Sequence, residues 1–327
     1  MRAISYDRFG PAEEVLSIIN LPDPVAGLGE VVVKLKYSGV NPSDVKSRAG
    51  LRPGVRKLAY DLIVPHSDGS GVIVSVGAEV DKKRVGQRVW IWNGQWRRAF
   101  GTMAEYIVLP AAQTVPLPAE INMEAGAAFG IPGLTAAYCL FGGGTIEGKT
   151  VLISGGAGAV GHIAVQLAKW AGAMVIATAS PKNHAKVLEM GADKVLDYCS
   201  ATIASDIKAL CPNGIDRSIE VEFGLNSIIL AEVMKPSSTI AVYGSARDMT
   251  PKMPFGEFLF KSLKIDMSLI YDLKMDLRQK AIDVLHAASA AGGLRPEIDC
   301  IYDFESCFQA HEKVQGGGRT GVSLIRL

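Results

Sequence analysis

The pattern of hydrophobic and polar positions changes character near residue 122. Before it, the segments Glu30–Tyr37 and Gly71–Val76 alternate apolar and polar side chains, as half-buried strands do. Turn signals such as Asn41-Pro42 and Pro53-Gly54 separate such segments, and few stretches have a helical period. This part of the chain predicts a compact, partly barrelled β domain.

After Asn122 the chain alternates strand-like and helix-like segments, which predicts an α/β domain with a parallel sheet and helices on both faces. Its predicted strands are 150–154, 174–178, 194–196, 215–221, 239–243 and, at the sheet edge, the apolar segment 263–270. A helix at 276–291 and a last strand at 322–327 are expected to return to the β domain. The predicted domains are therefore 1–124 with 272–327, and 125–271.

Composition adds limits but no chemistry. Of 327 residues, 48% are hydrophobic and 20% charged, with a net charge of +1, so neither nucleic acid nor a membrane is an expected partner. No apolar run approaches the ~20 residues of a membrane span, and the strand-like N-terminus does not resemble a signal peptide. The five cysteines form no C-x-x-C motif, which predicts reduced thiols in a cytoplasmic protein.

A glycine-rich turn follows the predicted strand 150–154. Gly156, Gly158 and Gly161 fit the pattern G-x-G-x-x-G, with Ala159 and Val160 inside it, and a helix-period run begins at His162. In this pattern the glycines permit a tight turn, a close approach to a pyrophosphate and close packing of helix on strand. The helix N-terminus supplies N–H groups for the phosphates, so the segment predicts a dinucleotide site.

Several further motifs accompany this loop. They are Ser38–Asp44 (SGVNPSD), Gly69–Ile73 (GSGVI), Gly86–Val89 (GQRV) and Gly130–Ala136 (GIPGLTA). With them the chain resembles the medium-chain dehydrogenase/reductase superfamily, in its zinc-free quinone oxidoreductase (zeta-crystallin-like) branch. The resemblance implies a GroES-like β domain and a Rossmann nucleotide-binding domain. It also implies a homodimer that pairs edge strands, for which 263–270 is the candidate.

Ligand chemistry argues against a metal. Zinc-dependent relatives place a thiolate and then a His-Glu pair where this chain has Asn41 and Ser67-Asp68. An amide and a hydroxyl are poor Zn²⁺ ligands, and no cysteine precedes Cys139 to form a structural zinc lobe. His66 stands one residue away and alone, so it is interpreted as a structural or hydrogen-bonding histidine. No metal is predicted.

The second strand of the dinucleotide unit ends without the carboxylate that binds the ribose of NAD. Ser180, Lys182 and Asn183 stand there instead and can donate to a 2′-phosphate, and NADPH-dependent relatives carry a tyrosine at the position of Tyr198. The predicted cofactor is NADPH. The resemblance further places a group of residues near the nicotinamide or the cofactor: Asn41, Thr135, Gly244, Ser245, Leu269, Tyr271 and Arg319. For Arg319 a flexible surface turn is the alternative.

No nucleophile–base pair is visible, and a hydride-transfer enzyme needs none, since the cofactor carries the chemistry. The resemblance implies hydride transfer to a quinone or an α,β-unsaturated carbonyl. One departure concerns Lys46, where typical zeta-crystallin-like proteins have a tyrosine. As in enone reductase relatives, Lys46 could polarise the substrate oxygen or contact the cofactor ribose, with Asp44 orienting it. The alternative is a surface lysine paired with a neighbouring carboxylate. An enoyl-thioester reductase and a non-enzymatic NADPH-binding protein remain alternatives, and a zinc alcohol dehydrogenase is the weakest.

Overall fold

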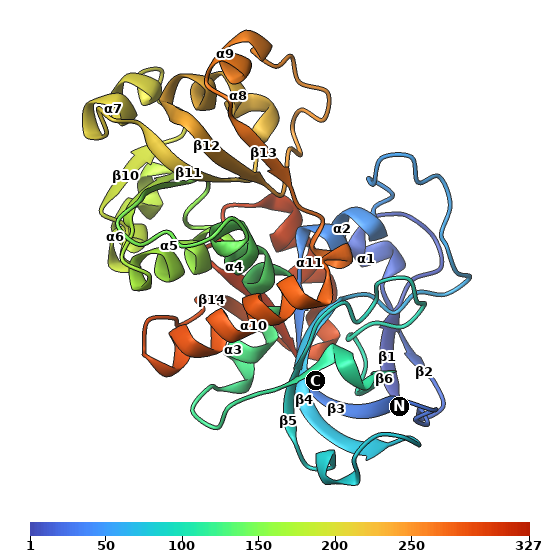
Figure 1. Ribbon diagram of the computed structural model, residues 1–327. Coiled ribbons are helices and arrows are strands. Elements are labelled where there is room, and N and C mark those ends of the chain that lie inside the picture. Colours follow the sequence, from blue (N-terminus) through green and yellow to red (C-terminus); the bar gives the residue numbers. More distant parts are fainter. The chain divides into compact units, whose positions relative to one another are not determined.

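The computed structural model describes all residues, 1–327, and comprises two compact units (Figure 1). The first unit consists of Met1–Ile131 and Pro296–Leu327, and the second of Pro132–Arg295. Each unit has its own sheet and its own buried clusters. No helix is both long and apolar enough to cross a membrane.

The first unit is built around β3 (Glu30–Val40), which pairs antiparallel with β4, β6 and β15. The seven strands run in the order β14-β15-β3-β4-β5-β7, with β6 beside β3, and a separate pair joins β1 to β2. The strands are β1 (Arg2–Ser5), β2 (Ser17–Asn20), β4 (Asp68–Val76), β5 (Arg88–Ile91), β6 (Tyr106–Pro110), β7 (Thr114–Pro116), β14 (Ile298–Tyr302) and β15 (Val322–Arg326). The helices are α1 (Ala12–Val15), α2 (Pro42–Arg48), α3 (Met123–Ala127) and α11 (Cys307–Gly316).

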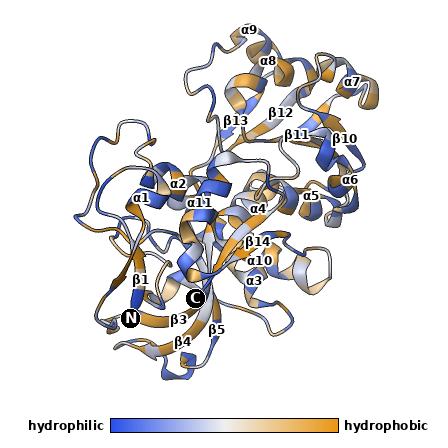
Figure 2. Cartoon of the chain, turned by 180° about the vertical axis from the view of Figure 1, so that it is seen from behind, coloured by the Kyte–Doolittle hydropathy of each residue, from blue (hydrophilic) through white to orange (hydrophobic).

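Alternation along β3 explains why it lies at the centre of this sheet. Val31, Val33 and Leu35 are buried and join a cluster with residues of β4, β5 and β6, whereas Lys34 and Lys36 are exposed. In Figure 2 both β1 and β3 are coloured largely as hydrophobic. The predicted strand-rich domain is confirmed here.

The second unit has six parallel strands in the order β10-β9-β8-β11-β12-β13. They are β8 (Thr150–Ile153), β9 (Met174–Ala179), β10 (Lys194–Asp197), β11 (Ile215–Glu220), β12 (Met234–Val242) and β13 (Lys264–Met267). Its helices are α4 (Leu134–Phe141), α5 (Gly161–Trp170), α6 (His184–Glu189), α7 (Ile203–Leu210), α8 (Phe223–Val233), α9 (Phe255–Phe260) and α10 (Met275–Ala290). The predicted parallel sheet is confirmed, and the strand predicted within 263–270 lies at its edge.

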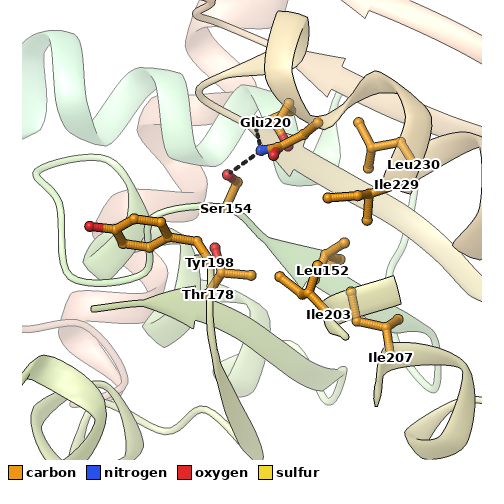
Figure 3. Close-up of a pocket in the computed structure, with 10 residues that line it drawn as sticks. Leu152, Ser154, Thr178, Tyr198, Ile203, Ile207, Glu220, Ile229 and Leu230 are labelled. Carbon is orange, nitrogen blue, oxygen red and sulfur yellow. Dashed lines mark hydrogen bonds between the residues drawn. The ribbon is translucent and has the colours of Figure 1, made fainter. Parts of the chain in front are cut away.

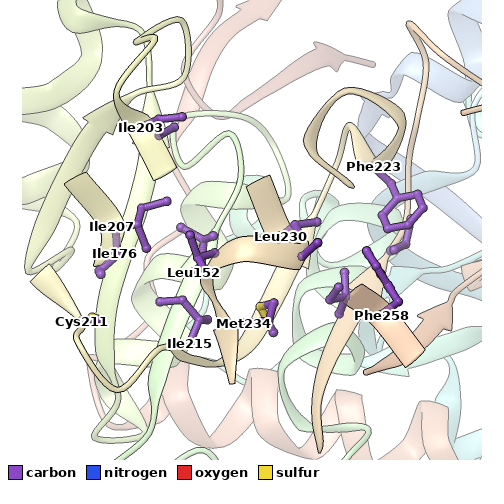
Figure 4. Packing of buried hydrophobic residues seen from close by; sticks show 14 residues of the cluster. Leu152, Ile176, Ile203, Ile207, Cys211, Ile215, Phe223, Leu230, Met234 and Phe258 are labelled. Carbon is purple, nitrogen blue, oxygen red and sulfur yellow. The ribbon is translucent and has the colours of Figure 1, made fainter. Parts of the chain in front are cut away.

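Helices cover both faces of this sheet. Residues of α7, α8 and α9 pack on one face over a cluster that includes Leu152, Ile207, Leu230 and Phe258 (Figure 4). On the other side α4, α5 and α10 contact one another, and α5 packs on β8 and β9. The order of strands reverses between β8 and β11, where doubly wound sheets bind their ligands.

The predicted return to the β domain at residue 272 is wrong. The helix expected there, α10, packs against α4 and α5, so it belongs to the second unit, and the chain re-enters the first unit only at Pro296. The first boundary lies at Ile131 rather than 124, because α3 packs on β3, β4 and β5. An amphipathic helix shows which of its faces is buried but not which sheet buries it.

Candidate functional site

The glycine loop joins β8 to α5, and its three glycines have different surroundings. A Cβ on Gly161 would lie 2.0 Å from the carbonyl oxygen of Gly155, and one on Gly156 would lie 2.9 Å from the Cβ of Ala177. A Cβ on Gly158 would meet only the Gly155 oxygen, at 3.3 Å. Gly155 itself takes the left-handed conformation, with φ 71°. The turn therefore needs Gly155, Gly156 and Gly161 for packing or conformation, whereas the backbone at Gly158 has one close neighbour and is otherwise open.

This space faces the start of α5, where the predicted loop residues Ala159 and Val160 lead into the helix. Val160 occupies the N-cap position and provides no side-chain cap. The His162 N–H of the first turn donates to the Gly158 carbonyl at 3.0 Å, so the backbone N–H groups of residues 159–161 are the candidates for binding a phosphate here. Thr178 holds the turn in place, because its Oγ1 accepts from the Gly155 N–H at 3.2 Å and its carbonyl accepts from the Gly156 N–H at 2.8 Å.

The residues predicted to bind the 2′-phosphate of NADPH lie close together in the structure. Ser180 follows β9 and precedes a single turn at Pro181–Asn183, which holds the exposed Lys182. In the pairing of β9 with β10, Ala179 lies opposite Asp197, so the next residues, Ser180 and Tyr198, leave the sheet side by side. The Tyr198 side chain is 52% exposed. Three hydrogen-bonding side chains thus share this edge with Asn183, and no carboxylate ends β9.

A polar cluster that the sequence analysis missed lies beside the loop, at the carboxyl ends of β8 and β11. The buried Glu220 carboxylate accepts from the Asn226 Nδ2 at 3.0 Å and from the Glu222 N–H at 2.5 Å, and Asn226 also donates to the Ser154 Oγ (Figure 3). Burial raises the pKa of Glu220, which these hydrogen bonds oppose. The cavity that Tyr198 shares with this cluster measures about 20 Å³, room for one water. The sequence did contain a signal for this cluster: Glu220 is a carboxylate near the end of the predicted strand 215–221.

A larger groove opens at the carboxyl ends of β12 and β13. It has a volume of about 610 Å³ and is lined by Phe223, Val242, Tyr243, Gly244, Ser245, Met249, Thr250, Pro251, Met253, Met267, Ser268 and Leu269. Three residues predicted near the nicotinamide are therefore grouped here. The Ser245 hydroxyl is engaged within the protein, because it accepts from the Gly224 N–H and donates to the Asp248 carbonyl. Its backbone is the part left for a ligand.

The two other residues predicted in this unit near the nicotinamide are buried. Thr135 lies in α4 and is 3% exposed, and Tyr271 lies in a single helical turn at Ile270–Asp272 and is 8% exposed. Neither lines the groove. Their roles toward a cofactor stay predictions.

In the first unit, Asn41 and two carboxyl groups form one buried cluster. The Asn41 Nδ2 donates to the Asp68 Oδ2 at 2.7 Å, and the Asp68 Oδ1 accepts from the Ile131 N–H at 2.8 Å. The Asn41 N–H donates to the Asp44 Oδ2 at 2.8 Å at the start of α2. Burial raises the pKa of Asp44 to about 7 and that of Asp68 well above its ordinary value. The side chain of Asn41 is thus tied to Asp68, where relatives with zinc have a metal ligand pair.

The position of Asp44 does not support the hypothesis that it orients Lys46. Its carboxylate caps the helix on which both residues stand, and it is 5% exposed. Residues two apart on a helix do not face each other. Lys46 is half-buried on α2, so if it acts on a substrate it does so without help from Asp44.

His66 is not alone, which corrects the sequence interpretation, although it is a hydrogen-bonding histidine as expected. The Thr102 hydroxyl donates to the Asp68 carbonyl at 2.6 Å and so accepts from Ser38, 2.7 Å away. Ser38, whose proton is thereby used, accepts from the His66 Nδ1–H at 2.8 Å. The Nε2 of neutral His66 is then a lone pair, and it accepts from the His311 Nε2–H at 2.8 Å. The chain of donors fixes both tautomers.

These two histidines and Cys307 of α11 are the buried side chains whose types could hold a metal, with ligand atoms within 4.8 Å of one another. The ring centroids are 5.0 Å apart, close to the N···N distance plus the two ring radii, so the nitrogens point directly at each other. Metal ligands instead converge on a third point. Burial also raises the pKa of the Cys307 thiol, which disfavours the thiolate that a metal needs. The arrangement fits a hydrogen bond and not a zinc site.

Arg319 lies against the end of α11. Its Nη1 donates to the Val314 carbonyl at 3.3 Å, one of the last carbonyls of that helix, and burial lowers the pKa of its guanidinium. This contact gives Arg319 a capping role. Its predicted contact with the cofactor stays a prediction.

Known proteins resemble the chain over its whole length. Residues 27–119 match the family described as alcohol dehydrogenase GroES-like domain, and residues 159–287 the family described as zinc-binding dehydrogenase. The quinone oxidoreductase of Mus musculus is 30% identical over 333 residues, covering all of this chain and 98% of that protein. Among solved structures, an NAD-dependent alcohol dehydrogenase (TM-score 0.88) and a mycobacterial protein complexed with NADPH (TM-score 0.85) are each 26% identical with full coverage of both chains.

Proposed function

Because the chain belongs to the medium-chain dehydrogenase/reductase superfamily, in its quinone oxidoreductase branch, we propose that it is an NADPH-dependent, zinc-independent reductase of quinones or α,β-unsaturated carbonyls. The observation that carries the proposal is the open backbone at Gly158 beside the uncapped start of α5. Such a site suits a pyrophosphate. The donors Ser180 and Tyr198, side by side and with no carboxylate at the end of β9, favour the phosphorylated cofactor.

In this proposal the protein's own groups bind, orient and neutralise charge, while NADPH supplies the hydride. The glycine loop would hold the pyrophosphate, and the groove lined by Gly244 and Ser245 would receive the nicotinamide ring. As hydride reaches the substrate, negative charge develops on its carbonyl oxygen, so a cation near that oxygen lowers the barrier. Lys46 is the proposed cation, and water supplies the proton.

The proposal is tested by following NADPH oxidation with quinones, enones and enoyl-thioesters. Activity on quinones or enones supports it, and tight NADPH binding without activity on any would favour a non-enzymatic binding protein. Preference for enoyl-thioesters would move the assignment to that reductase class. Full activity in a sample free of zinc by metal analysis is expected, and loss of activity on chelation would contradict zinc independence.

Replacing Ser180 by aspartate should reverse the cofactor preference. A carboxylate at the end of β9 repels a 2′-phosphate but accepts from a ribose hydroxyl. We expect kcat/KM for NADPH to fall about 10-fold or more, equivalent to ~1.4 kcal/mol, and that for NADH to rise. Lys280→Ala, at an exposed position on α10, serves as control. A wild-type enzyme that already prefers NADH would refute the cofactor assignment.

Lys46→Ala should reduce turnover of enones about 100-fold, since removal of one oxyanion-stabilising donor costs ~2.7–4 kcal/mol in other enzymes. Thermal stability should change little, because Lys46 is only half-buried. Lys36→Ala, on the exposed side of β3, is the matched control. Unchanged turnover would remove Lys46 from the mechanism.

We also propose a homodimer that joins edge strands β13. The strand is at the end of the sheet, so its outer backbone groups have no partner strand within one copy and suit pairing with a second copy. Sedimentation velocity at two protein concentrations tests this.

A further inference from the structure

The groove of the second unit has a lining unlike that needed for a bare quinone ring. No charged side chain lines it, and three of the chain's ten methionines do: Met249, Met253 and Met267. Met249 is 62% exposed and Met267 69% exposed, so these thioether chains are uncovered within this unit. Exposed apolar surface grouped in a concavity marks a binding site.

We propose that this groove binds a long aliphatic chain of the substrate, so that the enzyme prefers tailed enones or quinones over short ones. This inference rests on the proposed function for the reaction but not for the binding. Methionine is flexible and polarisable and adapts to apolar ligands of varied shape. A volume of about 610 Å³ holds roughly 20 non-hydrogen atoms if each takes about the ~30 Å³ of a liquid water. The nicotinamide ring proposed beside Gly244 and Ser245 takes part of this volume, and the part lined by the methionines is left for the substrate chain.

The position of the groove identifies the occupant as part of the substrate. The groove is lined both by Gly244, Ser245 and Leu269, which are predicted to lie near the nicotinamide, and by the three methionines. A substrate whose reacting carbonyl lies beside Gly244 therefore extends its chain along the methionines. The uncharged lining gives no partner to an anionic group, so a phosphate-bearing carrier would lie outside the groove.

The absence of charge also separates this groove from the cofactor's phosphate site. The donors that suit phosphate, Ser180 and Lys182, stand at the end of β9, whereas the groove lies at β12 and β13, on the other half of the sheet. One half of the sheet thus provides the site for the cofactor's phosphate, and the other half provides the apolar groove.

The test compares straight-chain enones of increasing length at fixed NADPH. Burial of each methylene is worth up to ~0.8 kcal/mol, so kcat/KM should rise about two- to four-fold per added methylene until the groove is full, mainly through KM. Met249→Asn and Met267→Asn should lower the ratio of long-chain to short-chain kcat/KM at least five-fold. Met275→Asn, at an exposed methionine outside the groove, should leave that ratio unchanged.

A second readout keeps this inference separate from the proposed reaction. Calorimetric binding of saturated methyl ketones to the NADPH-bound protein should show the same dependence on chain length. If no substrate is reduced but long ketones bind more tightly, the proposed reaction fails and the chain site stands. If neither kcat/KM nor binding affinity depends on chain length, the chain site is overturned. It is also overturned if Met275→Asn lowers the long-chain to short-chain ratio as much as the groove variants do. Dissociation of a dimer by Met249→Asn with no effect on chain selectivity would assign the groove to a second copy and also overturn it.

Discussion

Gly161→Ala should destabilise the second unit by about 3 kcal/mol or more, whereas Gly158→Ala should lose much less stability and bind NADPH weakly. The Cβ added at position 161 would lie 2.0 Å from the backbone oxygen of Gly155, which cannot move without opening the turn. Overpacking of this kind usually costs ~1–3 kcal/mol, and backbone clashes are at the upper end. At position 158 the same oxygen is the one neighbour within 4 Å, at a tight 3.3 Å, so a shift of a few tenths of an ångström is needed, and the methyl group occupies the space proposed for the pyrophosphate.

Urea denaturation and NADPH titration of the two variants separate these effects. Gly256→Ala, in α9 with no atom near the added Cβ, is the control and should be neutral or stabilise the protein by up to ~1 kcal/mol. Wild-type stability in Gly161→Ala would show that the turn has another arrangement. Unimpaired NADPH binding by Gly158→Ala would place the cofactor elsewhere.

Local patterns were enough to predict the second unit's sheet. Each strand of that sheet is a short apolar run between helices, and right-handed crossovers leave few ways to order such strands. The glycine loop was predictable for the same reason, since the roles of Gly158 and Gly161 depend on neighbours within one turn. The edge strand followed from its apolar sequence alone.

Contacts between distant residues were not predictable. His66 and His311 are 245 residues apart, and nothing local to either indicates a partner. Asp44 was read as a neighbour of Lys46 in sequence, but helix geometry turns it to the N-cap. The unit to which α10 belongs likewise depends on its packing against α4 and α5, which the sequence alone does not show. A site composed of one turn can be read from a sequence, whereas one composed of several segments needs the fold.

The buried histidine pair should make the protein acid-sensitive below about pH 6.5. Burial lowers the pKa of His66 to about 3, and burial with the nearby charge of Arg48 lowers that of His311 well below its ordinary value. Both are neutral in the folded protein, while in the unfolded chain they take up protons near pH 6.5. The unfolded state then binds more protons, so stability falls as pH decreases from 6.5 toward 3.

Two carboxyl groups act in the opposite direction. Because the pKa of Asp44 is raised to about 7 and that of Asp68 is also raised, the folded state binds protons that the unfolded state releases. Their contribution is fully present below the unfolded pKa near 4 and is lost as pH rises through 7. As pH falls, the histidines lower the free energy of unfolding of the wild type and the carboxyl groups raise it. A variant is therefore needed to isolate the contribution of the histidines.

His311→Gln isolates one of them, since its amide can still donate to the His66 Nε2 but does not titrate. Between pH 6 and 4 the free energy of unfolding of the wild type should fall more steeply than that of the variant, by about 1.4 kcal/mol per pH unit. Urea denaturation at half-unit pH steps measures the difference between the wild type and His311→Gln. Parallel curves for the wild type and His311→Gln would mean that His311 is protonated in the folded protein, and the direction of the His311–His66 hydrogen bond would have to be reassigned.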